Sequence, residues 1–401
     1  MMTLIHRLWL PALAMMSSAL VTHLQLSRDP HAIEYDRAWD ALVAPVPSQP
    51  EHIAPDLLLP QTLAREEGDI WKRLRTGFQF PPQLTLSAQV HVDNFRNHSH
   101  HIAEILQRGE PYLFYILSRV EARGLPAELA LLPVIESAFD PFVRSPAGAA
   151  GIWQFMPATA KQAGLRRDWW VDGRQDIVAA TEAALDYLSE LQQRFDGDWL
   201  LALSAYNAGS ARVNKAIRLN QSQGKPVDFW HLPLPKETRS YVPKLIALRA
   251  IIANPEAHNI ELPAMANSRY FSAVETGGQL DLQVAAQLAG TSMEELQRLN
   301  PGLIRSITPP SSQHSLLIPR ASEQRFRQQL ARLPAEQRVQ SVQYRVRSGD
   351  TLSAIAQHSR TTVARLRQIN QLDSTRIFAG KLLIVPLGEG DENARGALQA
   401  S

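Results

Sequence analysis

Glu136 is the residue of this sequence best placed to act as a general acid. It follows Leu129, Leu132 and Pro133 at spacings that share one face of a helix, so its carboxylate projects from an apolar face. Desolvation raises the pKa of a carboxyl group, which can then keep a proton near neutral pH and donate it. Taken alone, the same glutamate also fits a surface position near a helix end, because buried functional carboxylates are rare.

A glycine-rich segment, residues 145–160, comes next along the chain. Gly148 and Gly151 permit a tight turn and the close approach of a ligand. Residues 153–156, Trp-Gln-Phe-Met, add apolar contact and one amide, which suits a sugar. Pro157 is expected to begin a helix. By itself such a turn is more often structural than functional.

Two further segments carry polar groups on helices. Residues 199–209 predict a short apolar helix that ends at a glycine, with Tyr206 and Asn207 in its last turn. In residues 237–244, Tyr241 precedes a helix that we expect Pro243 to begin. Each segment could be scaffold, so the evidence lies in their joint order.

That order closely resembles the family 1 lytic transglycosylase domain, which has a goose-type lysozyme-like fold. The resemblance covers roughly residues 84–260 and rests on residues 136–137, 148–157, 205–209 and 237–241. It implies that Glu136 is the catalytic acid and base and that Ser137 positions the N-acetylmuramoyl group. It also implies a glycan cleft lined by Gln154, Met156, Tyr206, Asn207 and Tyr241.

The C-terminal residues 344–386 predict a strand, two helices and a closing strand. The runs Ser-Gly-Asp-Thr-Leu (348–352) and Gly-Lys-Leu-Leu-Ile-Val-Pro (380–386) make this unit resemble a LysM module. The resemblance implies a groove for N-acetylglucosamine-containing glycans, flanked by two loops. Their residues are Gly349, Asp350, Thr351 and Leu352 on one side and Ile377 and Phe378 on the other.

Residues 270–319 look like a worn second copy of this module. It has Gly-Gln-Leu-Asp (278–281) in place of the Gly-Asp-Thr-Leu turn. Two interpretations stay open for it: weak glycan binding, or a spacer that packs against the catalytic domain.

The whole chain is therefore expected to be mainly α, a helical catalytic domain followed by small βααβ modules. Its 401 residues predict several domains. We expect a signal segment (1–27), an extended, Pro-rich lead-in (28–83), the catalytic domain (84–260), the degenerate module (261–320), a linker (321–341), the LysM domain (342–387) and a tail (388–401).

The N-terminus predicts export. His6 and Arg7 precede an apolar run, 8–19, that is shorter than a spanning helix and ends in small residues. The alternatives are an uncleaved anchor, through which alone we expect membrane contact, or a misassigned start. No cysteine follows the run, so it is not a lipoprotein signal. We expect the periplasm or envelope of a Gram-negative-type bacterium.

Composition excludes several classes of function. The chain has no cysteine, which removes disulfides, thiol nucleophiles and cysteine-ligated metals. A net charge of +2 is too small to suggest nucleic acid as a partner. His98, His100 and His101 lack a carboxylate at fixed spacing, so we expect a solvated surface there, no metal and no cofactor. Nine arginines in residues 321–370 could favour an anionic cell-wall polymer, although a solvated face is the default.

The resemblance implies an enzyme that cleaves the β-1,4 bond between N-acetylmuramic acid and N-acetylglucosamine in peptidoglycan without water. A single carboxyl group suffices because the muramic 6-hydroxyl is the nucleophile and a 1,6-anhydro sugar is the product. A lysozyme would need a second carboxylate, and Asp140 is nearest in sequence. A catalytically inert cell-wall-binding scaffold is the third possibility.

Overall fold

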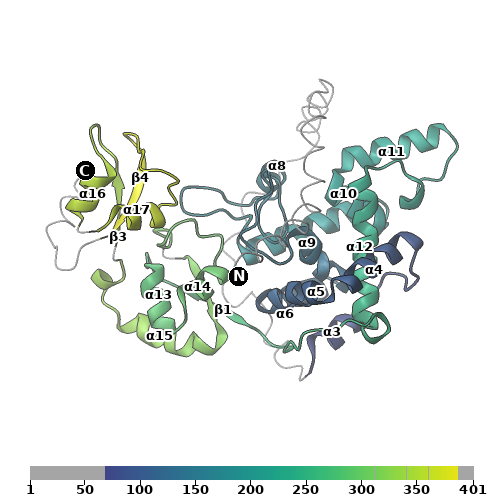
Figure 1. Cartoon of the computed structure of the whole chain (residues 1–401), viewed down its shortest axis with the longest axis horizontal. Coiled ribbons are helices and arrows are strands. Elements are labelled where there is room, and N and C mark those ends of the chain that lie inside the picture. The colour runs from purple at the N-terminus through teal and green to yellow at the C-terminus, as the bar shows by residue number, and fades with distance from the viewer. Residues whose placement is uncertain (1–67, 312, 340, 360, 387–401) are drawn as a thin grey trace, which may run out of the picture.

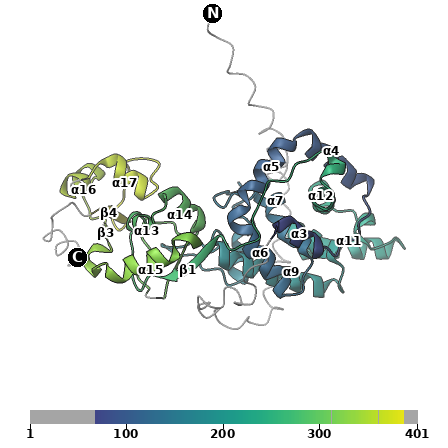
Figure 2. The same cartoon turned by 90° about the horizontal axis from the view of Figure 1, so that it is seen from below.

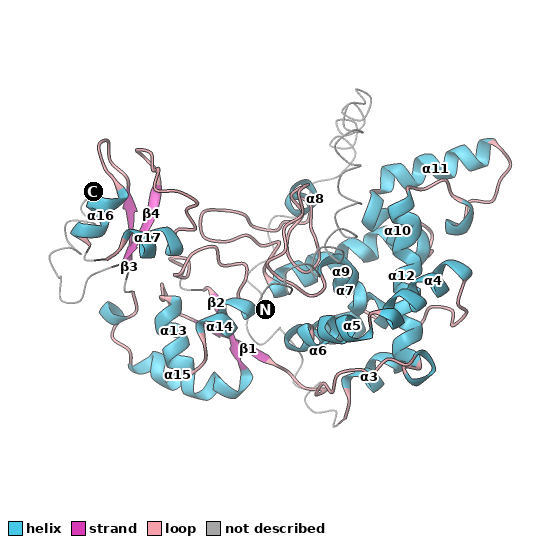
Figure 3. Ribbon diagram, viewed as in Figure 1, coloured by secondary structure: helices cyan, strands magenta, loops and turns pink. Residues whose placement is uncertain are grey.

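The computed structural model describes residues 68–386 except 312, 340 and 360. These residues form a large helical unit and two small modules, each with one pair of strands, so the expected mainly α architecture is confirmed (Figures 1 and 3). The predicted signal segment, residues 28–67 of the lead-in and the tail from 388 lie outside the described residues.

The large unit is built from helices α3 to α12. Its α-helices are α3 (Ile70–Thr76), α4 (Leu86–Asn97), α5 (Ser99–Arg108), α6 (Glu110–Ala122), α7 (Leu132–Ser137), α8 (Pro157–Gln162), α9 (Ile177–Arg194), α10 (Trp199–Ala208), α11 (Ser210–Ser222) and α12 (Lys236–Ala253). Short 3-10 helices lie at Ala127–Leu131, Phe229–His231 and Glu256–His258. Pro157 begins α8 and α10 ends before Gly209, as predicted.

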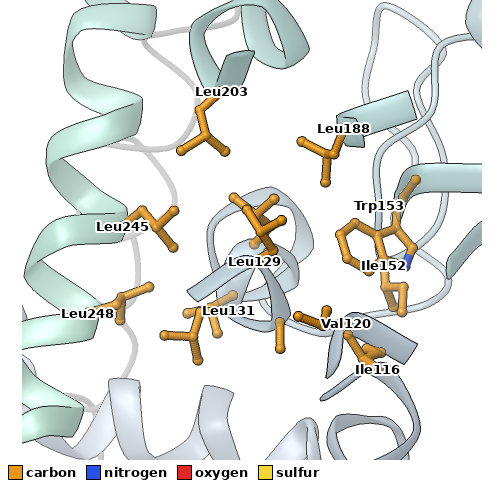
Figure 4. Packing of buried hydrophobic residues seen from close by; sticks show 14 of the residues in the cluster. Ile116, Val120, Leu129, Leu131, Ile152, Trp153, Leu188, Leu203, Leu245 and Leu248 are labelled. Atoms are coloured by element: carbon orange, nitrogen blue, oxygen red, sulfur yellow. The ribbon is translucent and has the colours of Figure 1, made fainter. Parts of the chain in front are cut away.

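One continuous hydrophobic core holds this unit together. The apolar stripe of α9 is buried, and the Asp176 side chain caps that helix by accepting from the Ala179 amide (2.8 Å). Around the 3-10 helix Ala127–Leu131, which leads into α7, the core packs side chains from α6, α9, α10 and α12 (Figure 4). The residues that will carry the site therefore stand on helices fixed by shared burial.

In the structure the helical unit begins before residue 84, the predicted start of the catalytic domain, because α3 is part of its core. Trp71 is fully buried and donates to the Pro263 carbonyl (2.7 Å). The Arg73 guanidinium donates to Glu121, Ser118 and Asn267. A buried guanidinium needs such partners, so this stretch belongs to the helical unit and is not a free lead-in.

The first small module consists of β1 (Phe271–Glu275), α13 (Leu282–Ala289), α14 (Met293–Leu299), β2 (Ser315–Pro319) and α15 (Glu323–Arg332). Strands β1 and β2 are antiparallel, with Ala273 opposite Leu317. Short 3-10 helices lie at Arg320–Ser322 and Ala335–Gln337. Phe326 and Leu330 of α15 are buried in the module core. About half of the predicted linker 321–341 is thus a packed helix, because Phe326 and Leu330 share one face of α15.

The second module consists of β3 (Ser341–Arg345), α16 (Leu352–His358), α17 (Val363–Ile369) and β4 (Leu382–Pro386), the βααβ order that we predicted. The two modules share one pattern of side-chain hydrogen bonds. Asn300 and Asn370 each bond through the side-chain amide to both backbone groups of a residue in the last strand, Leu317 and Ile384 respectively. This common contact supports the interpretation of residues 270–319 as a worn copy.

Both modules contact one loop of the helical unit, residues 165–176, and lie beside that unit in two views (Figures 1 and 2). The Asp172 amide donates to the Gly302 carbonyl (2.8 Å), and the Ile304 amide donates to the Trp170 carbonyl (3.0 Å). Trp169 and Trp170 pack on the core of the second module. The modules are therefore docked on the helical unit, which differs from the tethered arrangement that a linker implied.

Gly151 should be the glycine of the 148–157 loop least tolerant of a side chain. Its φ is +79°, and an added Cβ would stand 2.0 Å from the Arg174 carbonyl oxygen. We expect Gly151→Ala to lower the free energy of unfolding by about 3 kcal/mol or more, measured by urea denaturation. Gly224 is the control, because its φ is also positive (+64°) but no atom lies within 4 Å of the added Cβ. Gly224→Ala should cost only about 1 kcal/mol; equal losses would show that packing at Gly151 is unimportant.

Candidate active site

Glu136 lies on α7, a helix of less than two turns. We predicted one helix from Pro126 to Ser137, but the chain forms a 3-10 helix, Ala127–Leu131, and then α7. The break lies between Leu131 and Leu132, where Pro133 in the first turn of α7 has no N–H to continue a hydrogen-bond ladder from the preceding turn. Ala138 and Phe139 take positive φ and end α7. Leu129, Leu131 and Leu132 are fully buried in the core. Glu136 still emerges from the apolar face, as its spacing predicted.

The Glu136 carboxyl group is bonded to Tyr241 of α12. The Tyr241 hydroxyl donates to Glu136 Oε1 at 2.5 Å, across 105 positions of sequence. Burial raises the pKa of Glu136 to about 7, while the hydrogen bond from Tyr241 acts in the opposite direction. Desolvation is the larger effect, so the group can hold a proton at neutral pH.

Two charged residues of α12 also act on this carboxyl group. The negative charge of Glu237 raises the pKa of Glu136, and the positive charge of Lys244 lowers it. Glu237, Tyr241 and Lys244 are spaced by four and three residues, so they share one face of α12. Sequence reasoning identified only Tyr241. It expected Pro243 to begin the helix, whereas α12 begins at Lys236 and contains Pro243, and the shared face was therefore missed.

The glycine-rich loop is held by a buried arginine. Arg174 donates to the Gly148 carbonyl (2.6 Å) and is paired with Asp172 through two nitrogens. Gln154 takes a positive φ of 48°, which is uncommon for a residue with a side chain. Its amide nitrogen donates to the carbonyls of Gly151 (2.8 Å) and Val143 (3.3 Å), so only the amide oxygen of Gln154 is left for a ligand. Met156 is 42% exposed at the end of this loop.

Ser137 is buried and faces the protein. Its hydroxyl lies 3.2 Å from the Pro133 carbonyl and 3.0 Å from the Ile152 carbonyl, either of which can accept its hydrogen bond. The second contact links α7 to the glycine-rich loop. In the structure the Ser137 side chain therefore connects α7 to the glycine-rich loop and is not exposed in the cleft.

Tyr206 and Asn207 reach the site from the last turn of α10. The Tyr206 hydroxyl donates to the Trp153 carbonyl (2.9 Å), and burial together with the charge of Glu136 raises the pKa of Tyr206 well above its usual value. Thr238 donates to the Asn207 amide oxygen (2.8 Å), which turns the amide nitrogen of Asn207 away from Thr238. Thr238 was not singled out from sequence, although its place in the Glu-Thr-x-x-Tyr run was a usable signal.

In the second module the two predicted loops lie side by side. Val346 and Gly380, at their bases, are joined by a 2.7 Å backbone hydrogen bond. Asp350 accepts from Tyr344 and from the Arg347 amide, Thr351 caps α16, and both Gly349 and Thr351 are exposed. Ile377 is half-buried and Phe378 is 67% exposed. Leu352 is buried in the core of the module, so it supports the first loop and offers no surface to a glycan.

The histidine cluster is a surface feature. His100 and His101 both lie near Glu104, and each is exposed. Among the described residues no group of three or more histidines and carboxylates is arranged to hold a metal ion. None of the helices within residues 68–386 combines the length and the apolar character that crossing a bilayer requires.

Comparisons with known proteins agree with this arrangement. Residues 115–229 match the transglycosylase SLT domain, residues 270–335 the LysM-like domain of lytic transglycosylase MltD, and residues 344–386 the LysM domain. The chain is 37% identical over 340 residues to membrane-bound lytic murein transglycosylase D of Escherichia coli, covering 80% of this chain and 74% of that protein. It is 35% identical over 152 residues to membrane-bound lytic murein transglycosylase F of Pseudoalteromonas translucida, covering 35% of this chain and 30% of that protein.

A solved structure of the lytic transglycosylase Slt from Pseudomonas aeruginosa is 27% identical and covers 36% of this chain and 24% of its own, with a TM-score of 0.29.

The helical unit with its SLT domain match and the two LysM-type modules define a modular lytic transglycosylase. The length and the sequence identity of the match to the Escherichia coli protein are sufficient to assign the family. The chain belongs to the membrane-bound lytic murein transglycosylase D family.

The raised pKa of Glu136 should make stability depend on pH. The folded group binds its proton more tightly than the unfolded one, whose pKa is about 4.5, so the free energy of unfolding falls as pH rises from about 4.5 to about 7. We expect Glu136→Gln to match the wild type near pH 4 and to exceed it by about 3 kcal/mol at pH 8 in urea denaturation. Glu261 is the control, because it is exposed and forms no ion pair within the described residues, and Glu261→Gln should show no such divergence. Parallel curves for the Glu136 variant and wild type would mean that the carboxyl group is not desolvated.

Proposed function

We propose that this protein cleaves the β-1,4 bond between N-acetylmuramic acid and N-acetylglucosamine in peptidoglycan and leaves a 1,6-anhydro end. The observation that carries the proposal is the desolvated Glu136 carboxyl group, whose pKa is raised to about 7. Around it stand the glycine-rich loop, the end of α10 and the shared face of α12. Family membership supports the same reaction.

Glu136 acts twice in this mechanism. Protonated Glu136 donates its proton to the glycosidic oxygen, the bond to C1 breaks, and an oxocarbenium-like centre develops. The carboxylate then accepts the proton of the muramic 6-hydroxyl as that oxygen attacks C1. Tyr241 stabilises the charged form between these steps, because its hydrogen bond lowers the pKa of Glu136. Tyr206 and the Ser137 contact hold the surrounding loop, and Asn207, Gln154 and Met156 line the cleft.

A hydrolytic reaction remains the second candidate, since Glu237 is a carboxylate within electrostatic reach of Glu136. A hydrolase of the lysozyme type uses a second carboxylate to place water or to trap the sugar. Asp140, the candidate named from sequence, accepts from the Phe142 amide (2.9 Å) within its own turn. Glu237 is therefore the better test of hydrolysis.

We further propose the following division of the chain. Residues 68–267 form the catalytic unit, 270–338 the docked module and 341–386 the LysM module that binds glycan through its exposed loops. The docked module contributes Phe271, Ala273, Leu299 and Leu317 to the catalytic core, so it acts as a spacer. The relatives of this family are named membrane-bound, and we propose that this chain works in the cell envelope after export through residues 1–27.

Glu136→Gln should keep the fold and the binding of glycan strands but remove most cleavage, because an amide preserves shape and cannot donate the proton. The expected loss is about 100- to 10,000-fold in turnover. Mass spectrometry of sugars released from purified sacculi by the wild type should show anhydro ends. Reducing ends that vanish in Glu237→Gln would identify a hydrolase, and wild-type turnover by Glu136→Gln would refute the role of Glu136.

Phe378→Ala should separate anchoring from cleavage. Because Phe378 is exposed and the module core does not depend on it, we expect weaker retention on insoluble peptidoglycan, by about tenfold, from loss of a stacking contact. Cleavage of short soluble muroglycans should be unchanged, since the site lies in the helical unit. Phe142, also exposed (51%), belongs to the helical unit, and Phe142→Ala is the matched control for retention. Equal retention of Phe378→Ala and the wild type would show that these loops do not anchor the protein.

A further inference from the structure

Helix α11 and the segment that follows it form a hairpin that projects from the helical unit (Figures 1 and 3). The inner face of α11 packs against the protein, since Val213, Ala216 and Asn220 are buried. The Asn220 amide donates to the carbonyls of Pro226 (2.7 Å) and His231 (2.9 Å), which binds the returning chain to the helix. These contacts give the hairpin a defined conformation.

The outer surface of this hairpin exposes large apolar side chains. Leu219 is 46% exposed, Val227 37% and Trp230 44%. Trp230 stands edge-on against buried Phe229, with ring centroids 4.9 Å apart, so its indole is held in place at the surface. Water solvates such side chains poorly, and a cluster of them often marks a contact surface.

The same surface carries unpaired positive charge. Arg212, Lys215, Arg218 and Lys225 are all exposed, and none of them makes an ion pair within the described residues. The single acidic residue between 210 and 231 is Asp228, which contacts His231 at 2.8 Å. On α9, by contrast, Arg194 pairs with Glu190 one turn away.

We propose that the α11 hairpin docks on an anionic membrane surface. Lysine and arginine would contact phosphate headgroups, while Trp230, Leu219 and Val227 enter the interface beside them. Tryptophan flanked by aliphatic and basic residues is the combination that binds this boundary. An acidic polymer could pair with the cations, but it would leave the three apolar side chains in water, so the observations favour a bilayer.

The position of the hairpin gives this docking a consequence for the catalytic site. Helix α11 begins three residues after Asn207, and Leu219 follows Asn207 by twelve residues. At 1.5 Å per helical residue, the docking face and the cleft lie within about 20 Å of each other. Docking would keep the cleft beside the glycan strands nearest the membrane. It requires no residue of the proposed cleavage site.

The test is co-sedimentation with vesicles of phosphatidylcholine, alone or mixed with phosphatidylglycerol. The chain without residues 1–27 is used, because it keeps every described residue and removes the N-terminal apolar run. We expect binding to the anionic vesicles only, weakened by salt. Lys215→Gln with Arg218→Gln should reduce the affinity about tenfold or more. Leu219→Ser with Trp230→Ser should have a similar effect without any change in charge.

Arg325→Gln with Arg332→Gln is the matched control, because it removes the same charge from exposed positions on α15. It should leave vesicle binding unchanged, and all variants should keep the wild-type melting temperature and cleavage of soluble muroglycans. If the control variant lost as much affinity for anionic vesicles as the hairpin variant, net charge alone would explain the binding, and the proposal would be overturned. Absence of binding to anionic vesicles would overturn it as well. Unchanged vesicle binding by both hairpin variants, with weaker retention on peptidoglycan, would assign the surface to the acidic polymer instead.

Discussion

The desolvation of one carboxyl group is the constraint on which the rest of this structure depends. Burial raises the pKa of Glu136 to about 7, because a buried carboxylate loses its hydration. The charged form therefore needs neighbouring groups that stabilise it in place of water. Tyr241 supplies the hydrogen bond, and Glu237 and Lys244 apply opposing charges from the same helix. Helices α7 and α12 must therefore meet at a fixed distance, which the leucine-rich core between them secures.

The loop of residues 165–176 connects the catalytic cleft with the two modules. On one side, Arg174 supports the glycine-rich loop at the Gly148 carbonyl, and its own carbonyl leaves no room for a side chain at Gly151. On the other side, Asp172 and Trp170 exchange backbone hydrogen bonds with the first module. Module docking and cleft shape thus share one short stretch of chain, so a change at either end acts on the other through it.

The two small modules illustrate how one fold can be used in two ways. Both close their last strand through an asparagine amide, Asn300 or Asn370. The first module has lost the Gly-Asp-Thr-Leu turn and buries apolar side chains in the catalytic core. The second retains the turn, held by Asp350, and keeps Phe378 exposed. The first module is therefore fixed by packing against the catalytic core, while the second keeps an exposed surface that a ligand can reach.

Local patterns in the sequence determined the start of α8, the end of α10, the βααβ order and the apolar face that carries Glu136, because each depends on residues within a few positions of one another. Tertiary structure alone decided the bond from Tyr241, the inward orientation of Ser137 and the burial of Leu352. It also decided that α3 and α15 are packed elements, where composition indicated a lead-in and a linker. These features depend on contacts between residues that are distant in sequence. No spacing rule encodes such contacts, since they form only when the whole core closes.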